Sequence, residues 1–299
     1  MMPTKNGALH LFRVRGINVY VHWTWFLVIW FVLQLRVNVY EGKLWNLIEY
    51  LSLFGIVLLH EFGHALACRQ VGGTADQIVL WPLGGVAYVA PPPRPGPTLW
   101  SIAAGPLVNV ALVPILFALN VWAASQGGGL VQSDFGKWLS ALQFMNLLLL
   151  VFNMLPVYPL DGGQILRALL WFPLGRARSL LIATIFGFIG VAALAAFAFL
   201  RRDLFLGFIA LMVFMNCRTA WMQARALGKL AALPRHANLS CPSCHSSPPA
   251  GDLWKCGGCQ TAFDLFANGG VCPQCHSRYD QTRCPECGHL GPVSDWEKK

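Results

Sequence analysis

Charged residues are scarce in this sequence and make up only 12% of its 299 positions. A soluble domain of this size carries about a quarter charged residues. Acidic residues are the scarcer kind, with 13 Asp and Glu against 22 Lys and Arg, while hydrophobic residues fill 56% of the chain. The shortage of charge excludes an ordinary soluble enzyme and predicts that most of the protein surface lies in a membrane.

The net charge of +9 does not indicate a nucleic-acid partner. From Leu239 to Lys299 there are five Lys or Arg and six Asp or Glu, so this tail carries about −1. The positive charge therefore lies in the apolar part of the chain, where it orients helices across a bilayer. This distribution of charge argues against nucleic acid as a partner.

Six apolar runs are long enough to cross the hydrocarbon core, which takes about 20 helical residues. They lie at 20–38, 44–68, 98–124, 137–155, 179–200 and 203–222. The first run could be a signal peptide, but no small-residue cleavage site follows it and Arg36 comes directly after, so we interpret it as a retained span. The sequence predicts an all-α polytopic membrane protein with about six transmembrane helices.

Orientation follows from the Lys and Arg residues near alternate span ends. One set has twelve, namely Lys5, Arg13, Arg15, Arg69, Arg94, Arg167, Arg176, Arg178, Arg218, Arg225, Lys229 and Arg235. The other set has five, namely Arg36, Lys43, Lys137, Arg201 and Arg202. The positive-inside rule places the richer set, and with it both termini, in the cytoplasm. We therefore expect a multi-pass protein of the cell membrane.

The second span contains the pattern His60-Glu61-Phe62-Gly63-His64. On a helix, positions i and i+4 share a face, so both imidazoles can bind one metal ion. Glu61, beside the first histidine, can then act as a general base. A polar contact between helices is the alternative, but ionisable residues inside a membrane are by default functional candidates.

A catalytic zinc site needs a third protein ligand and an open position for water. Asp161 is the best candidate, because Pro156 and Pro159 end the fourth span and a helical pattern resumes after Gly163. We expect Asp161 to cap that new helix, whose positive end favours an ionised carboxylate. A helix cap without a metal is the alternative for this residue.

These segments resemble the site-2 protease family of intramembrane zinc metalloproteases, and the resemblance runs over residues 10 to about 220. The motifs are His60–His64, the Asp-Gly motif at Pro159–Gly163, Gly105-Pro106-Leu107-Val108-Asn109 and the loop Leu83–Val86. The resemblance implies that His60, His64 and Asp161 bind one catalytic zinc and that Glu61 is the general base. It also implies substrate contacts for Asn153 and Asn109, with a polar span end and a helix–helix contact as the respective alternatives.

The segment from Asp76 to Val89 predicts a small re-entrant β-hairpin with its turn at 82–85. Its edge could pair with an extended segment of substrate. A helical substrate hides its carbonyl groups, so we expect it to unfold locally before cleavage.

Eight of the ten cysteines form four Cys-x-x-Cys pairs in the tail. They are Cys241/Cys244, Cys256/Cys259, Cys272/Cys275 and Cys284/Cys287. A four-thiolate zinc site needs two such pairs, so the tail resembles a double zinc ribbon with two structural zinc ions. We expect the pairs to combine in sequential order rather than as a cross-brace. Disulfides are the alternative, but the tail is predicted to lie in the reducing cytoplasm.

Two domains are therefore expected, a transmembrane metalloprotease domain at 1–235 and a double zinc ribbon-like domain at 236–299. The leading hypothesis is a zinc endopeptidase that cuts a membrane-embedded protein, with the tail docking a protein partner or regulating the enzyme. A non-proteolytic scaffold with a structural metal site is the alternative, although such a site has no use for Glu61. A metal transporter would need ionisable residues along a path, and the spans offer few.

Overall fold

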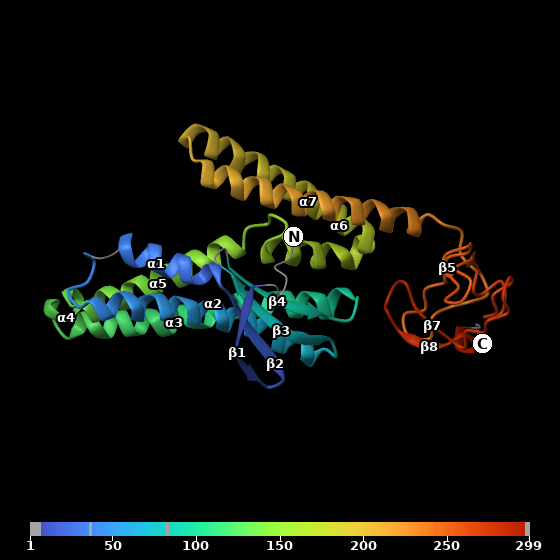
Figure 1. The fold of residues 1–299 in the computed structure, drawn as a ribbon, viewed down its shortest axis with the longest axis horizontal. Coiled ribbons are helices and arrows are strands. Elements are labelled where there is room, and N and C mark those ends of the chain that lie inside the picture. The colour runs from blue at the N-terminus through green and yellow to red at the C-terminus, as the bar shows by residue number, and fades with distance from the viewer. Residues whose placement is uncertain (1–6, 36–37, 82–83, 297–299) are drawn as a thin grey trace.

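The computed structural model describes residues 7–35, 38–81 and 84–296, which form a helical unit, a four-stranded sheet and a small tail (Figure 1). The helices are α1 (Thr24–Leu35), α2 (Lys43–Gln70), α3 (Pro95–Ser125), α4 (Gly128–Gln132), α5 (Asp134–Asn153), α6 (Asp161–Arg201) and α7 (Leu204–Ala231). The strands of the sheet are β1 (Ala8–Val14), β2 (Ile17–His22), β3 (Thr74–Trp81) and β4 (Gly84–Ala90). Lys5 and Arg36, used above for orientation, lie outside the described residues.

Five helices in the described part of the chain are long and apolar enough to cross a membrane. They are α2 from Leu44, α3, α5, α6 and α7. The expected first span at 20–38 is not met there, because its first residues belong to β2 and helix α1 has only 12 residues. At 1.5 Å per residue α1 measures roughly 18 Å, well short of the roughly 30 Å hydrocarbon core.

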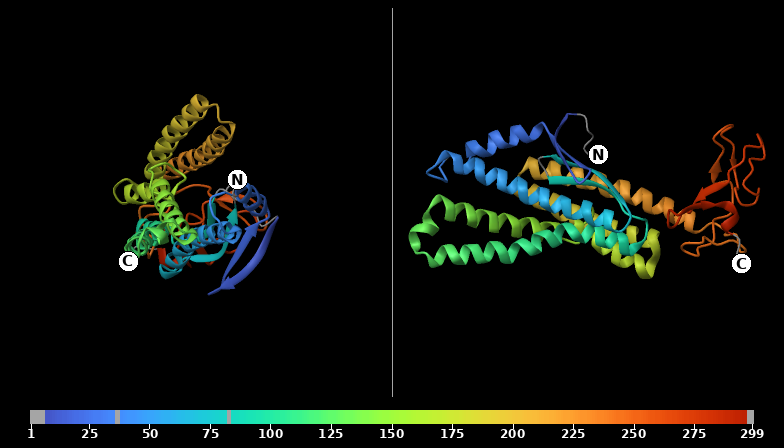
Figure 2. Two further views of the ribbon diagram at one scale, coloured as in Figure 1. Left: turned by 90° about the vertical axis from the view of Figure 1, so that its left-hand side faces the viewer. Right: turned by 90° about the horizontal axis from the view of Figure 1, so that it is seen from below.

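Helices α2, α3 and α5 lie side by side and form the centre of the helical unit (Figure 2). Small residues let α2 and α3 approach closely: a Cβ on Gly63 would lie 2.6 Å from the carbonyl oxygen of Ala104. Towards the other end, Ile56 packs with Leu116 of α3 and Leu139 of α5. This packing holds α2 in place against two neighbours.

The predicted hairpin is present as the antiparallel pair β3–β4, but it is half of a larger sheet with the order β1-β2-β3-β4. β2 runs parallel to β3, and α1 and α2 form the crossover between them. Ile17, Ile78 and Leu80 pack with Ala65 and Cys68 of α2, so the sheet covers the last turns of that helix. The turn at 82–83 lies outside the described residues.

Helix α5 ends at Asn153, three residues before Pro156, and α6 begins at Asp161. The intervening chain folds back on the start of α6, where a Cβ on Gly162 would lie 2.4 Å from the carbonyl oxygen of Met154. Asp161 is not the N-cap that the sequence predicts. Leu160 takes that position, since its carbonyl accepts the hydrogen bond of Gln164 N–H, and Asp161 is the first helical residue.

Helix α6 is longer than its predicted span because about four turns, beginning at Asp161, precede a kink at Gly175, where φ is 77°. After the kink it forms an antiparallel hairpin with α7 that extends away from the central helices (Figure 1). The tail follows α7 and contains two small sheets, β5 (Trp254–Lys255) with β6 (Ala262–Phe263) and β7 (Gln281–Arg283) with β8 (Leu290–Pro292), then a 3₁₀ turn at Val293–Trp296.

Candidate active site and metal centres

The two histidines of α2 lie on the face that packs against α3. Their Nε2 atoms are 3.1 Å apart, and both residues are buried, with exposed fractions of 3% and 6%. α3 leaves room for them through Gly105, because a Cβ at this position would lie only 2.2 Å from Nε2 of His64. The i, i+4 spacing and the missing side chain together create the pocket for the two imidazoles.

Asp161 brings its carboxylate to the same point from the start of α6. Its Oδ2 lies 3.1 Å from Nε2 of His60 and 3.4 Å from Nε2 of His64. The structure thus brings together the three side chains predicted as catalytic zinc ligands. They come from two helices, and His60 and Asp161 are separated by 101 positions in the chain.

The three ligand atoms fit a zinc ion. In a tetrahedral site with bonds of about 2.0 Å, neighbouring ligand atoms are about 3.3 Å apart, close to the distances observed here. Nδ1 of His64 lies 2.9 Å from the carbonyl oxygen of Ser101, and Nδ1 of His60 lies 2.6 Å from Oδ1 of Asn109. Each Nδ1 therefore carries the proton, and the lone pairs of both Nε2 atoms face the Asp161 carboxylate. Such converging acceptors repel one another unless a cation lies between them.

Glu61 lies next to these ligands, against the sheet. Its Oε2 accepts a 2.7 Å hydrogen bond from Ala87 N–H of β4, and the residue is 7% exposed. Gly85 makes this contact possible, since a Cβ there would lie 2.4 Å from Cγ of Glu61. The carboxylate is held beside the metal-binding cluster by the backbone of a strand.

The two asparagines predicted to contact substrate have different surroundings. Asn109 is fully buried, and its amide lies between His60 and Asn146 of α5. Asn109 therefore makes the contact between helices that was given as the alternative, and its amide is hydrogen-bonded within the protein. Asn153 is half-buried at the last turn of α5. A substrate contact for Asn153 stays a prediction.

Sequence reasoning missed three groups at this site. Ser101 and Ala87 act through backbone atoms, which no side-chain pattern reveals. Asn146 is fully buried in the apolar run of α5 and donates to the carbonyl oxygen of Asn109 at 3.0 Å. Its signal was available, because a lone amide inside an apolar span needs a partner.

The tail cysteines form two clusters, but not in the sequential order that the spacing suggested. The first pair joins the fourth, in Cys241, Cys244, Cys284 and Cys287, and the second joins the third, in Cys256, Cys259, Cys272 and Cys275. We call the unit around Cys241, Cys244, Cys284 and Cys287 the outer ribbon and the unit around Cys256, Cys259, Cys272 and Cys275 the inner ribbon, because the second lies within the first along the chain. Phe266 joins the two, with its ring 4.9 Å from that of Trp296 and 5.4 Å from that of Trp254. The spacing of the cysteines does not encode this pairing, which brings together segments far apart in the tail.

Both clusters fit zinc. Sulfur–sulfur distances between pairs run from 3.3 to 3.8 Å, near the roughly 3.8 Å expected for thiolates around one zinc and far above a disulfide bond of about 2.05 Å. Hydrogen bonds from the Tyr279 hydroxyl and from the backbone N–H groups of Cys259 and Gly258 lower the pKa of Cys256 to about 5. A low pKa favours the thiolate, which is the form that binds metal.

The outer ribbon contacts the helical unit at two connectors. Arg94, just before α3, donates a hydrogen bond to the Ser243 hydroxyl, and Arg176, just after the α6 kink, lies 3.5 Å from the carbonyl oxygen of Pro285. A Cβ on Gly288 would lie 3.0 Å from Cγ of Pro93. The tail therefore touches the chain that leaves β4 and the helix that begins with Asp161.

Part of this chain is similar to known proteins. A zinc metalloprotease of Methanocaldococcus jannaschii is 29% identical over 211 residues, which cover 71% of this chain and 60% of that protein. Rip3 of Mycobacterium tuberculosis, named as a zinc metalloprotease, is 31% identical over 175 residues, which cover 55% of this chain and 44% of Rip3. The chain thus spans less than two thirds of the length of these relatives.

The solved structure of a site-2 protease from Methanocaldococcus jannaschii superposes with a TM-score of 0.52 at 27% identity, covering 72% of this chain and 95% of that one. The model of peptidase family M50 matches residues 49–131 and 120–197, which contain His60, Glu61, His64 and Asp161. This chain belongs to peptidase family M50, the site-2 protease family.

Proposed function

We propose that this chain is a zinc endopeptidase that hydrolyses a peptide bond within or next to a transmembrane segment of a membrane protein. One observation carries the proposal: the carboxylate of Glu61, which is not needed as a ligand, is held beside the His60, His64 and Asp161 cluster. A structural metal site has no use for such a base. Membership of the family and the names of the relatives agree with this activity.

Each side chain has a task in hydrolysis. His60, His64 and Asp161 would hold the zinc ion, which supplies a more acidic water and polarises the scissile carbonyl group. Glu61 accepts a proton from the attacking water and delivers it to the leaving nitrogen. Ala87 N–H orients the Glu61 carboxylate for both transfers.

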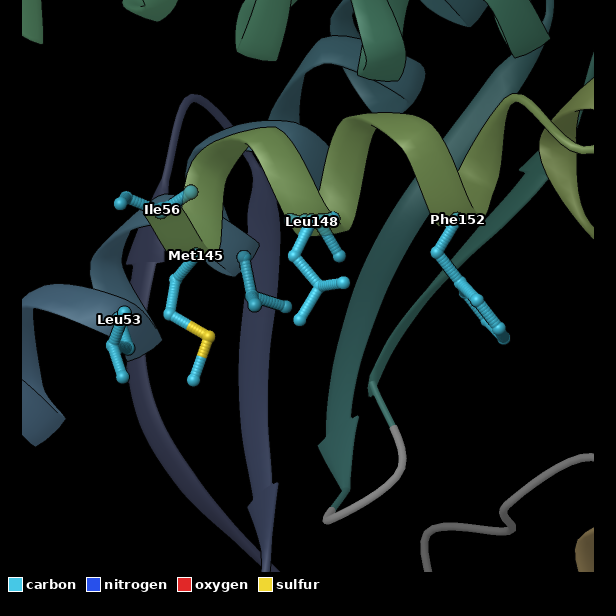
Figure 3. Close-up of a pocket in the computed structure, with 7 residues that line it drawn as sticks. Leu53, Ile56, Met145, Leu148 and Phe152 are labelled. Carbon is cyan, nitrogen blue, oxygen red and sulfur yellow. The ribbon is translucent and has the colours of Figure 1, made fainter. Parts of the chain in front are cut away.

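An apolar groove supports the proposal that the substrate is a transmembrane segment. It lies between α2 and α5 and has a volume of about 330 Å³ (Figure 3). The lining residues are Leu53, Ile56, Val57, Met145, Leu148, Leu149 and Phe152. Val57 lies one helical turn before Glu61, and Phe152 directly precedes Asn153. The groove thus extends along α2 towards the catalytic carboxylate, and its lining suits the apolar side of a substrate helix.

The outer edge of β4 supports capture of an extended segment. β4 is the last strand of the sheet, and Ala87 N–H points away from β3 towards Glu61. A substrate strand added to this edge would lie beside the carboxylate that acts on it. We therefore propose that the substrate helix unwinds at the groove and pairs with β4.

The remaining assignments concern the whole chain. We propose a multi-pass protein of the cell membrane with both termini in the cytoplasm, as the excess of Lys and Arg on one side favours. We further propose one catalytic and two structural zinc ions, and a division near residue 235 into a protease domain and a zinc-ribbon domain. The tail would bind a protein partner or act on the protease through the connectors it contacts.

The test is cleavage of a reconstituted library of transmembrane substrates by the wild type and by Glu61→Gln, with zinc counted in both. We expect the wild type to cut and Glu61→Gln to keep its zinc while losing activity by a factor of at least about 10². Cleavage by Glu61→Gln at the wild-type rate would refute the role of the base. If neither protein cuts while both hold three zinc ions, the scaffold alternative is favoured.

A further inference from the structure

Two fully buried asparagines meet behind the metal-binding cluster. Asn109 lies in α3 and Asn146 in α5, and both have exposed fractions of 0%. Asn146 stands between Met145 and Leu147 in an otherwise apolar stretch of its span. A buried amide in such a place is costly unless its hydrogen bonds are made.

The hydrogen bonds of this pair form a series that starts at the backbone carbonyl of Asn109 and ends at His60. Asn146 Nδ2 donates to the backbone carbonyl of Asn109 at 3.0 Å, and Asn146 Oδ1 accepts from Asn109 Nδ2 at 2.8 Å. The remaining atom, Asn109 Oδ1, lies 2.6 Å from Nδ1 of His60. Because a carbonyl oxygen can only accept, it fixes which atom of each amide donates along the whole series.

We propose that Asn146 is a positioning residue for His60. By binding the carbonyl of Asn109 it holds the Asn109 amide with its oxygen towards His60, which keeps the proton on Nδ1 and the lone pair of Nε2 directed at the metal. With the Asn109 amide reversed, its N–H would face Nδ1 and favour the tautomer protonated on Nε2. The inference rests on the zinc site of the proposed function but not on any substrate or cleavage.

The neighbouring ligand supplies an internal comparison. Nδ1 of His64 lies 2.9 Å from the carbonyl oxygen of Ser101, which can only accept and needs no further group to orient it. A change at Asn146 therefore acts on His60 and leaves the tautomer of His64 as it is. General loosening of the helices would alter both histidines alike.

The test uses the full-length protein in detergent with labelled histidines. The ¹⁵N signals of His60 and His64 report the tautomer in the metal-free protein, and their change during zinc titration reports affinity at this site alone. In Asn146→Leu we expect a mixture of His60 tautomers, an unchanged His64 and a zinc dissociation constant raised about 10- to 100-fold. Asn146→Ala carries the same expectation if the Leu variant does not fold.

A rescue variant and a matched control separate positioning from packing. In Asn146→Asp either protonation state of the carboxyl group accepts from Asn109 Nδ2, so we expect the His60 tautomer of the wild type and zinc affinity within about threefold. Asn120→Leu removes another amide between α3 and α5, one that donates to Leu116 and Leu139 carbonyls at 2.9 and 3.4 Å. It should leave both histidines unchanged.

The proposal is overturned if His60 keeps one tautomer and its zinc affinity in both Asn146→Leu and Asn146→Ala. Equal changes at His60 and His64 would also overturn it, because they would show loss of packing. These readouts need no proteolysis. A protein that shows the expected tautomers and zinc binding but cuts nothing would therefore refute the proposed function alone.

Discussion

Glycines position the reactive side chains by what they leave out. Gly105 gives His64 its place against α3, Gly85 does the same for Glu61 against β4, and Gly63 brings the two helices together. At each of these positions a single methyl group would lie under 3 Å from a neighbouring atom. The geometry of the site is therefore sensitive to the smallest possible side chain.

Gly105→Ala should cost zinc affinity. The new Cβ would displace the His64 imidazole, so we expect the zinc dissociation constant of this site to rise at least about tenfold, measured by titration of the full-length protein. Helix stability cannot explain such a loss, because Ala favours a helix over Gly by about 1 kcal/mol. Gly55→Ala is the matched control in α2, where a Cβ meets nothing within 4 Å. Equal zinc affinity in both variants would contradict this account of Gly105.

Among the elements, β4 joins the sheet to the active site. Its N–H groups alternate in direction, so Val89, two residues after Ala87, is expected to present its N–H at the same outer edge of the sheet. A proline cannot donate there.

Val89→Pro should therefore lower kcat/KM for a transmembrane substrate about tenfold while zinc content stays at the wild-type value, since the ligands lie elsewhere. Val89→Ala, which keeps the N–H, controls for the lost side chain and should stay within about threefold. Unimpaired cleavage by Val89→Pro would show that substrates do not pair with β4.

The groove between α2 and α5 allows a test at the same scale. Leu148 is 50% exposed in its lining, and Leu148→Trp would fill part of the volume that a substrate helix is proposed to contact. We expect kcat/KM for a transmembrane substrate to fall about fivefold, the equivalent of roughly 1 kcal/mol of apolar contact. Cleavage of a short peptide should be unchanged. Phe144→Trp, at a 63% exposed position of α5 outside the lining, should alter neither rate.

At the scale of the whole molecule, the nested order of the tail determines which cysteines belong to the same metal site. If Cys241 and Cys287 belong to one site, the double variant Cys241→Ser/Cys287→Ser loses one zinc ion, whereas Cys241→Ser/Cys256→Ser loses two. Sequential pairing gives the opposite counts. Metal analysis of the two purified variants distinguishes the pairings directly.

The outer ribbon also makes the contacts described above between the tail and the helical unit. Its knuckles meet Arg94 and Arg176, whereas the inner ribbon is joined to the outer one through Phe266. Loss of the outer zinc should therefore free the tail from the helical unit, which cross-linking between positions 94 and 243 can measure. An unchanged cross-linking yield in Cys241→Ser/Cys287→Ser would show that the docking does not depend on the outer zinc.

Local features of the sequence were enough to predict the membrane setting and the candidate site. Scarce charge and long apolar runs require a membrane, and the spacing of His60 and His64 on one helix, with so few acidic residues to choose from, points to Asp161. Local rules carry such inferences because they depend on residues a few positions apart. The same rules place the helix break at Pro156 and the hairpin at β3 and β4.

Tertiary structure decided what depends on residues far apart. The pairing of β2 with β3, the nested order of the cysteine pairs and the hydrogen bonds from Asn146 to Asn109 all join segments that no local pattern relates. The apolar run at 20–38 is divided in the described residues between the end of β2 and the 12-residue helix α1, a division that hydropathy alone does not show. The observed packing buries the sheet against α2 and satisfies the polar groups behind His60, because contacts between distant segments supply both the apolar cover and the hydrogen-bond partners.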